Sequence, residues 1–420
     1  MKKTWIWFSA VAVFVATSVA AQVTAIRAGQ LVDPASGTTA RDQVILIEAG
    51  KITAVGPGLA IPAGATVVDL SKRTVLPGFF DVHTHLCLNL KTQGGVGLQE
   101  LLRSLLAATA IETTAYRSIE GVANARDMLR SGFTTVRDVG NAGNYADTAL
   151  RRAIEDGLVP GPTVVNAGRI IAPYGGQYHG IPPERADITL PEYLYADTAD
   201  EMRKAVRENI AFGARVIKIV VDDQPYLYSV EDVRTIVKEA ATGGLKVAAH
   251  CATDAGSRIA AEGGVASVEH AYRATTPTLE LMKAKGVFLV GTDFTTVASH
   301  EMGMDEYHPW VVDRLKRAYQ VGTPVAFGTD VCFVKEGETR GTLSIEFITS
   351  FVEAGVAPKQ ILQAMTVNAA RLMGMEKVRG AIAPGFAADI VATSENPLEK
   401  IDTVRHVTFV MKGGQVIRND

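Results

Sequence analysis

Residues 76–85 read LPGFFDVHTH, an apolar run that ends in two histidines, His83 and His85. An apolar run of this length predicts a buried strand. Side chains two residues apart on a strand point to the same side, so we expect both imidazoles to be able to bind the same metal ion. A lone histidine is more often an ordinary core residue, but a pair at this spacing indicates a metal site.

The chain beyond this strand alternates between apolar, strand-like runs and amphipathic, helical stretches. Such alternation is typical of α/β proteins with parallel strands. Eight runs fit a (β/α)8 TIM barrel. The alternative is a doubly wound open sheet, but the sequence has no G-x-G-x-x-G fingerprint of that fold after the first strand. The eight runs are residues 76–85, 134–139, 163–171, 216–221, 246–250, 267–270, 287–290 and 325–329.

The two ends of the chain have a different pattern. Short apolar runs separated by glycine and proline turns predict β-structure in residues 22–75, and residues 377–420 return to the same character. We expect these segments to pair into one small β-sandwich domain beside a barrel domain of residues 76–376.

Residues 1–21 have the three parts of a secretory signal peptide. Lys2 and Lys3 come first, an apolar run covers residues 5–15, and small residues precede a cleavage site after Ala21. The alternative is an uncleaved membrane anchor, but the apolar run is shorter than the roughly 20 residues that span a bilayer. The sequence thus predicts a periplasmic or secreted protein without membrane association after cleavage.

Composition narrows the range of partners. Lys and Arg total 42 against 45 Asp and Glu, a formal net charge of −3. That balance offers no basic surplus for nucleic-acid phosphates or anionic lipid, so we expect a small-molecule or peptide substrate and no nucleic-acid partner. Three cysteines in 420 residues cannot build a disulfide framework.

Four more polar residues lie in or close apolar runs. Lys218 lies in the fourth run, His250 and His270 end the fifth and sixth, and Asp330 follows the eighth. The active site of a barrel is built where its strands end, so these side chains are expected to meet the histidine pair of the first run. The two further histidines would supply a second pair of nitrogen ligands for a metal.

Lys218 and Asp330 each have an alternative interpretation. An unpaired ammonium is costly to bury, so Lys218 is either an ion-paired or snorkelling lysine, or it is carbamylated by carbon dioxide into a carboxylate that bridges two metals. Asp330 is either a helix N-cap or a carboxylate that binds a metal and takes the proton from bound water.

This set of residues resembles that of the amidohydrolase superfamily. Within it, the chain is most similar to the imidazolonepropionase-like and Xaa-Pro dipeptidase-like branch, which includes metal-dependent carboxypeptidases, dipeptidases and enzymes that cleave ochratoxin-type amides. The stretches that carry the resemblance are residues 76–85, 132–138, 146–162, 328–330, 366–370 and 385–391.

The resemblance implies a binuclear zinc site and an amide-cleaving reaction. A metal-bridging hydroxide would attack the amide carbonyl, and Asp330 would pass a proton to the leaving amine. Proteins of this family commonly form homo-oligomers, so the same is implied here. The implied ligands are His83, His85 and Asp330 for the more buried ion, His250 and His270 for the more exposed one, and carbamylated Lys218 between them.

Candidates for substrate binding lie at a strand end and on loops. Arg137 ends the second run and could bind a carboxylate with two hydrogen bonds, or it could pair with Asp138 or another acid. His179, Tyr226 and Tyr228 are hydrogen-bond candidates, or they are ordinary loop residues.

Three segments bear on substrate preference. Residues 222–228 stand where the family often has a glycine-rich segment, and residues 174–180 stand where it often has T-G-G-H-G. Both are expected to line the mouth of the site, so these departures from the family pattern bear on substrate preference, while all six metal-ligand positions are intact. The leucine-rich stretch 98–111 is either an apolar wall or lid of the site, or a core-facing helix.

These observations favour a hydrolase that releases a C-terminal amino acid from an N-acyl amino acid or a dipeptide. The same site could instead cleave a lactone, a cyclic amide or a phosphotriester. A non-catalytic binding protein on an enzyme fold is the third hypothesis. Its sign would be a broken ligand set, and all six ligand positions are present.

Overall fold

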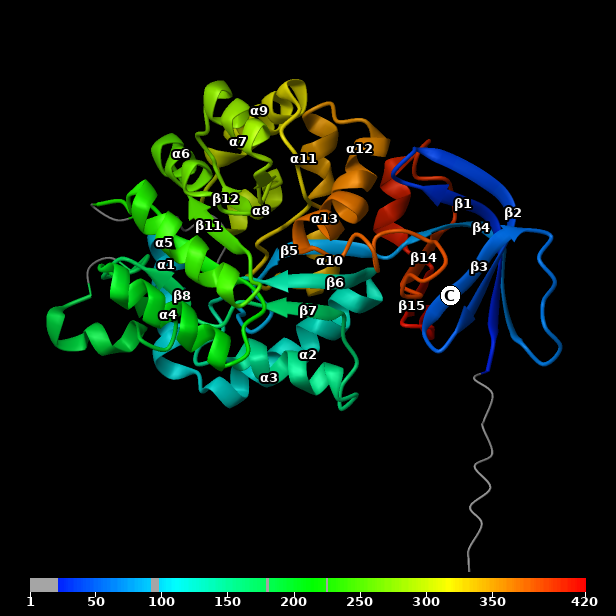
Figure 1. The fold of residues 1–420 in the computed structure, drawn as a ribbon, viewed down its shortest axis with the longest axis horizontal. Helices are drawn as coiled ribbons and strands as arrows, with labels where there is room; N and C mark the ends of the chain where they lie inside the picture. The colour runs from blue at the N-terminus through cyan, green and yellow to red at the C-terminus, as the bar shows by residue number, and fades with distance from the viewer. Residues whose placement is uncertain (1–21, 92–97, 179–180, 224–225) are drawn as a thin grey trace, which may run out of the picture.

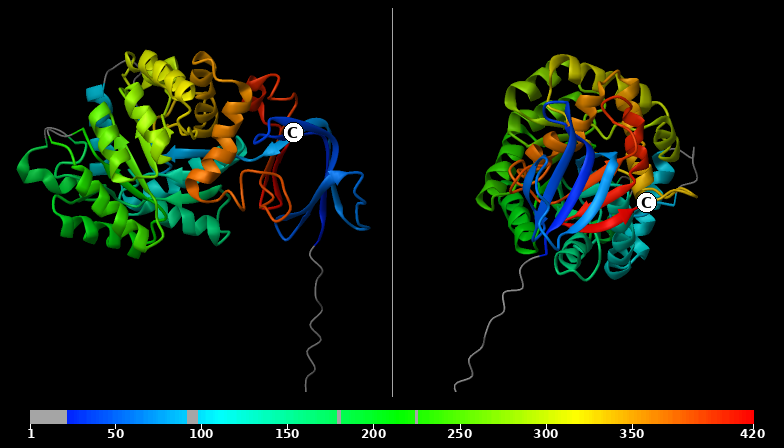
Figure 2. Two further views of the ribbon diagram at one scale, coloured as in Figure 1. Left: turned by 45° about the horizontal axis from the view of Figure 1, so that its top comes forward. Right: turned by 90° about the vertical axis from the view of Figure 1, so that its right-hand side faces the viewer.

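The protein is described by a computed structural model over residues 22–91, 98–178, 181–223 and 226–420. Helices surround parallel strands, and a further sheet lies at one end of them (Figure 1). Seen from that end, strands from both termini lie side by side in front of the helices (Figure 2). The chain is thus an α/β protein, as expected; the predicted signal peptide lies outside the described residues.

Both ends of the chain contribute to one seven-stranded sheet, in the order β16-β15-β14-β4-β1-β2-β3. The expected sandwich of two sheets is therefore one continuous sheet, and its two halves share an apolar core that includes Ile45 and Phe409. The strands are β1 Thr24–Asp33, β2 Thr38–Glu48, β3 Lys51–Pro57, β4 Thr66–Pro77, β14 Ile390–Thr393, β15 Phe409–Lys412 and β16 Gln415–Asn419.

The central strands pair in parallel and form two sheets, in the orders β5-β6-β7 and β13-β12-β11-β10-β8-β9. Parallel strands of this kind are buried on both sides, which explains their nearly continuous apolar sequences. The strands are β5 Phe79–Thr84, β6 Phe133–Asp138, β7 Thr163–Asn166, β8 Ile170–Ala172, β9 Tyr193–Tyr195, β10 Ile217–Val220, β11 Val247–Cys251, β12 Ser267–His270 and β13 Phe288–Val290.

Three of the predicted strands differ from the observed ones. The first run is divided at Gly78, where the chain passes from β4 to β5; a Cβ atom there would lie 2.2 Å from Thr134 Oγ1. The third run breaks at Gly168, which has a left-handed φ of 70°, into β7 and β8. The eighth run forms no strand and makes one β-bridge, from Val325 to Leu289.

The eighth run nevertheless lies between the two central sheets. On one side, Ala326 N donates to Leu289 O of β13 at 3.0 Å. On the other side, Val82 N of β5 donates to Phe327 O at 2.9 Å, and Asp330 N donates to His83 O at 2.8 Å. This segment therefore joins the edge of one sheet to the edge of the other.

Helices follow most of the central strands, and several begin at sequence-encoded caps. Thr198 and Ser229 each bond the helix N-terminus reciprocally with an acidic residue three positions later. The helices are α1 Leu98–Ile111, α2 Thr114–Arg130, α3 Ala146–Glu155, α4 Ala199–Ala211, α5 Val230–Thr242, α6 Asp254–Gly263, α7 Thr276–Lys285, α8 Thr296–Glu301, α9 Tyr307–Val321, α10 Arg340–Ile345, α11 Ile348–Glu353, α12 Pro358–Gln363, α13 Ala369–Met373, and the short turns η1 Pro183–Thr189, η2 Ala364–Asn368 and η3 Ile401–His406.

Within the described parts of the chain, no helix is both long enough and apolar enough to cross a membrane.

The space between β5, β6 and the eighth run is filled by aromatic rings. Phe133 lies 6.3 Å from Phe79 and 6.1 Å from Phe327, measured between ring centroids, and all three are fully buried. Their packing holds together the strands that carry the candidate site.

We predict that Phe133→Ala lowers the thermal unfolding midpoint strongly, because truncation of a buried phenylalanine costs about 3–5 kcal/mol. The matched control is Phe212→Ala, since Phe212 is 55% exposed and should cost far less. Thermal unfolding followed by circular dichroism compares the two variants. Equal midpoints would contradict the role given to this aromatic cluster.

Candidate functional site

One cavity of about 270 Å³ collects all six of the predicted metal-binding side chains. It opens where the central strands end, and its wall continues onto helix α1 and the loops that follow the strands. The six residues lie on β5, at the position that directly follows it, on β10, β11 and β12, and on the segment after the eighth run: His83, His85, Lys218, His250, His270 and Asp330.

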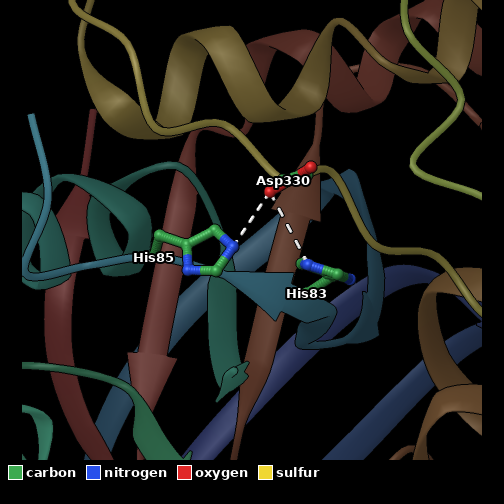
Figure 3. Close-up of side chains that lie close together, drawn as sticks. All are labelled: His83, His85 and Asp330. Atoms are coloured by element: carbon green, nitrogen blue, oxygen red, sulfur yellow. Dashed lines mark ion pairs between the residues drawn. The ribbon is translucent and has the colours of Figure 1, made fainter. Parts of the chain in front are cut away.

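The histidine pair at the end of β5 faces Asp330. His85 Nε2 lies 3.0 Å from Asp330 Oδ1, and His83 Nε2 lies 3.6 Å from the same oxygen (Figure 3). The three side chains have donor atoms close enough to hold one metal ion. Despite burial, the two imidazoles hold the pKa of Asp330 below its usual value, so its carboxyl group is ionised.

The other ring nitrogen of each histidine is committed to a protein acceptor. His83 Nδ1 lies 2.7 Å from Glu269 Oε2, and His85 Nδ1 lies 2.7 Å from Gly140 O. Both acceptors require the proton on Nδ1, which leaves Nε2 free to bind a metal when the ring is neutral. Burial favours that state at His83, where it lowers the pKa to about 4.

Glu269 is held in turn by Arg137. Arg137 Nη2 donates to Glu269 Oε1 at 2.8 Å, and Arg137 Nη1 donates to Ser267 Oγ at 2.9 Å. Although burial acts in the opposite direction, Arg137 and His83 hold the pKa of Glu269 well below its usual value. Arg137 is therefore in an internal ion pair, the alternative that the sequence left open, and it does not line the cavity.

Lys218 is fully enclosed at the floor of the cavity. Only 2% of its surface is exposed, and burial lowers the pKa of its ammonium group to about 8, against the opposing effect of Glu269 and Asp330. A lysine with this pKa exists in part as a neutral amine near neutral pH.

The second histidine pair lies beside the first. The rings of His250 and His270 are 4.4 Å apart, and those of His83 and His270 are 5.0 Å apart, between centroids. His250 Nε2 lies 2.5 Å from Asp223 Oδ2. His270 Nδ1 lies 2.9 Å from Thr292 Oγ1 and 3.7 Å from an oxygen of Asp330.

A second group with donor atoms that could hold a metal ion combines Asp222, Asp223 and His250. Asp222, however, is already used by the backbone: its carboxylate accepts hydrogen bonds from Ala252 N and Thr253 N, each at 2.8 Å. It anchors the loop that starts α6. Asp223 and His250 are the members of this group that line the cavity.

The other proposed substrate-binding residues lie elsewhere. Tyr226 is exposed and donates to Tyr174 O, and Tyr228 is buried and donates to Ala196 O at 2.7 Å. Both tyrosines are thus loop-packing residues, which the sequence also allowed, and neither lines the cavity. His179 lies outside the described residues.

The leucine-rich stretch forms an apolar wall of the cavity, one of the two expected outcomes. Leu101, Leu102 and Leu105 of α1 line it, and Met304 and Tyr307 line it too. A pocket with an apolar wall and a polar floor is typical of sites for small organic molecules.

Sequence reasoning missed Glu269, although it is next to a predicted ligand. Consecutive strand residues point to opposite sides, so a strand that presents His270 should turn Glu269 away. The chain resolves this because β12 ends at His270 with a left-handed φ of 67°. Asp330 has a similar φ of 63°, and such positions cluster at functional sites. Nothing in the sequence pattern signals these breaks.

Comparison with known proteins identifies the family. The model of the amidohydrolase family matches residues 74–417. Ochratoxinase of Aspergillus niger is 29% identical in sequence, over an alignment that covers 96% of this chain and 88% of ochratoxinase. The crystal structure of that ochratoxinase superposes with a TM-score of 0.78 at 26% identity, and the match covers 95% of this chain and 96% of the ochratoxinase chain. Imidazolonepropionase of Symbiobacterium thermophilum is 29% identical over 86% of this chain and 84% of its own.

A crystal structure of a Xaa-Pro dipeptidase with bound methionine in its active site has a TM-score of 0.79 at 27% identity. It covers 94% of this chain and 99% of its own. The family match spans most of the chain, and both the sequence relatives and this structure agree with the resemblance noted in the sequence. The chain therefore belongs to the amidohydrolase family and is a hydrolase that acts on C–N bonds.

Proposed function

We propose that this protein is a binuclear zinc amidohydrolase that cleaves the amide or peptide bond of an N-acyl amino acid or a dipeptide. The observation that carries the proposal is the convergence of six potential ligands on one cavity.

We also propose that the central strands close into a (β/α)8 barrel. The hydrogen bonds of the eighth run to β13 and to β5 support this closure.

The donor set fits a pair of metal ions. His83, His85 and Asp330 would hold one ion, His250 and His270 the other, and carbamylated Lys218 would bridge them. Bound there, the ions would lower the pKa of a water molecule and polarise the substrate carbonyl. The Nδ1 contacts of His83 and His85 support this assignment, since metal-binding histidines usually have their second nitrogen hydrogen-bonded.

The protein's own groups would move the protons. Asp330 is ionised and central, so it can accept a proton from the nucleophilic water and return it to the leaving amine. A neutral Lys218 amine can add to carbon dioxide with loss of one proton, which forms an N–C bond and gives a carbamate anion. This change would convert a buried cation into a buried ligand.

The relatives support an amide as the substrate. A Xaa-Pro dipeptidase is named for a dipeptide, whose two residues are joined by a peptide bond, and ochratoxinase is named for ochratoxin. The leucine wall of α1 would receive an apolar group of an amide substrate. The periplasmic or secreted location, the homo-oligomeric assembly and the domain bounds stay predictions of the sequence.

Asp330→Asn is expected to lower kcat by about 10²–10⁴-fold, because it removes the proposed general base. The measurement is the release of free amino acid from a panel of N-acyl amino acids and dipeptides by zinc-loaded protein. Asp200→Asn is the matched control, since Asp200 is 96% exposed on α4 and does not line the cavity. Full activity of Asp330→Asn would refute the mechanism.

Glu269→Gln is expected to weaken zinc binding about 10–100-fold, because Gln no longer fixes the proton on His83 Nδ1. Competition with a chelator measures the affinity, and thermal unfolding checks that the variant is folded. Glu280→Gln on the exposed side of α7 is the control. A folded Glu269→Gln protein with unchanged zinc affinity would contradict the assignment.

Carbamylation of Lys218 is testable without an activity assay. Protein loaded with zinc in ¹³C-labelled bicarbonate should give a carbamate carbon signal in NMR, and Lys218→Arg should abolish it. Lys246→Arg is the control, because Lys246 lies outside the cavity and its Nζ donates to Leu372 O. A signal that survives in Lys218→Arg would assign the carbamate to another site.

A further inference from the structure

The loop after β6 presents an asparagine to the cavity. Asn141 lines it and is 9% exposed. Its Nδ2 atom is buried and has no hydrogen-bond partner among the residues that the structure describes. A buried donor without a partner is unfavourable, so such a group in a binding cavity indicates that a ligand supplies the acceptor.

The loop that carries Asn141 is fixed on three sides. Gly140 O accepts the hydrogen bond from His85 Nδ1, Asn141 O accepts one from Arg117 Nη2, and Gly143 N donates to Glu192 Oε2 at 3.0 Å. Asn141 itself has a left-handed φ of 51°, which asparagine tolerates better than most residues. The backbone that carries the Asn141 side chain is thus held in place by the surrounding structure.

Arg117 and Glu192, which both bond to the Asn141 loop, also form a buried ion pair that anchors helix α1. Arg117 and Glu192 are both fully buried and bond to each other. Thr109 of α1 donates to Glu192 Oε1 at 3.2 Å and contacts Tyr178 OH at 2.9 Å. The leucine wall of α1 and the Asn141 amide therefore keep a fixed relation to one another across the cavity.

Two other neutral polar side chains of the cavity have protein partners. Gln177 Nε2 donates to Asp223 Oδ2 at 3.2 Å, and Tyr272 OH lies 3.1 Å from His270 Nδ1. Among the described residues that line the cavity, Asn141 Nδ2 is the buried side-chain polar atom without a protein partner.

We infer that Asn141 is a specificity-determining residue, whose Nδ2 donates to a carbonyl or carboxylate oxygen of a substrate that packs its bulky apolar group against the leucines of α1. This inference rests on the proposed function and adds the substrate class: amides in which an oxygen acceptor lies close to a large apolar group. Small polar amides would lack the apolar contact with the leucines of α1.

Two probes that cannot be hydrolysed test this assignment. Hydrocinnamate carries a phenyl group and a carboxylate, and benzylacetone carries the same phenyl group and a neutral carbonyl. Their Kd values are measured by calorimetry on the zinc-loaded full chain, for wild type and for three variants. Asn141→Asp replaces the donor with an anionic acceptor, Asn141→Gly removes it while it permits the left-handed backbone, and Asn144→Asp alters an exposed residue of the same loop.

We expect Asn141→Gly to raise Kd about 5-fold and Asn141→Asp to raise it at least about 10-fold, as loss of a neutral or charge-assisted hydrogen bond predicts. Asn144→Asp should bind like wild type. A loss limited to hydrocinnamate identifies the acceptor as a carboxylate, and a loss with both probes identifies any carbonyl-type oxygen. Either result supports the inference.

Unchanged Kd values in both Asn141 variants overturn the inference, and so does a wild-type protein that binds neither probe. The outcome is separate from that of the proposed function. Asn141-dependent binding together with no hydrolysis of the amide panel would refute the proposed reaction alone. Hydrolysis by wild type together with unchanged binding would refute the role of Asn141 alone.

Discussion

The carboxylate of Glu269 joins three strands at the centre of the site. It lies on β12, and it pairs with His83 of β5 and Arg137 of β6. A buried charge persists only when it is paired, so these strand ends must stay within hydrogen-bond distance of each other. The same contacts fix the His83 tautomer and occupy the Arg137 guanidinium. The arrangement of the ligands thus depends on a carboxylate that the cavity itself does not expose.

Backbone strain completes what the strand pattern begins. His270 and Asp330 both have left-handed backbones, a conformation that costs about 1–3 kcal/mol at each such residue. Specific hydrogen bonds offset the cost: Arg314 donates to His270 O, and Asp330 N donates to His83 O. Because the chain turns sharply at His270, the His270 side chain reaches the cavity while the adjacent Glu269 still bonds to His83.

The sequence could predict the parts of this protein that follow from strand periodicity and strand ends. His83 and His85 are found by their spacing, and the leucine stretch is found by its composition. What could not be predicted is pairing across the fold. Whether Arg137 meets a substrate or Glu269 depends on which strands are neighbours, and the Tyr228 contact with Ala196 O depends on where a distant loop passes. The eighth run has strand-like residues, but it bonds to both sheets without a regular ladder.

The two halves of the site are supported by different interactions, and this has a consequence for specificity. The ligands are held by Glu269 and the strand ends, whereas the leucine wall and the Asn141 loop are held by the Arg117–Glu192 pair. The His85 contact with Gly140 O is the direct link between them. Substitutions on the cavity side of α1 therefore leave the ligand contacts in place while they change the shape that a substrate meets. A family that shares one reaction can vary its substrates in this way, because the groups that select the substrate are not those that fix the chemistry.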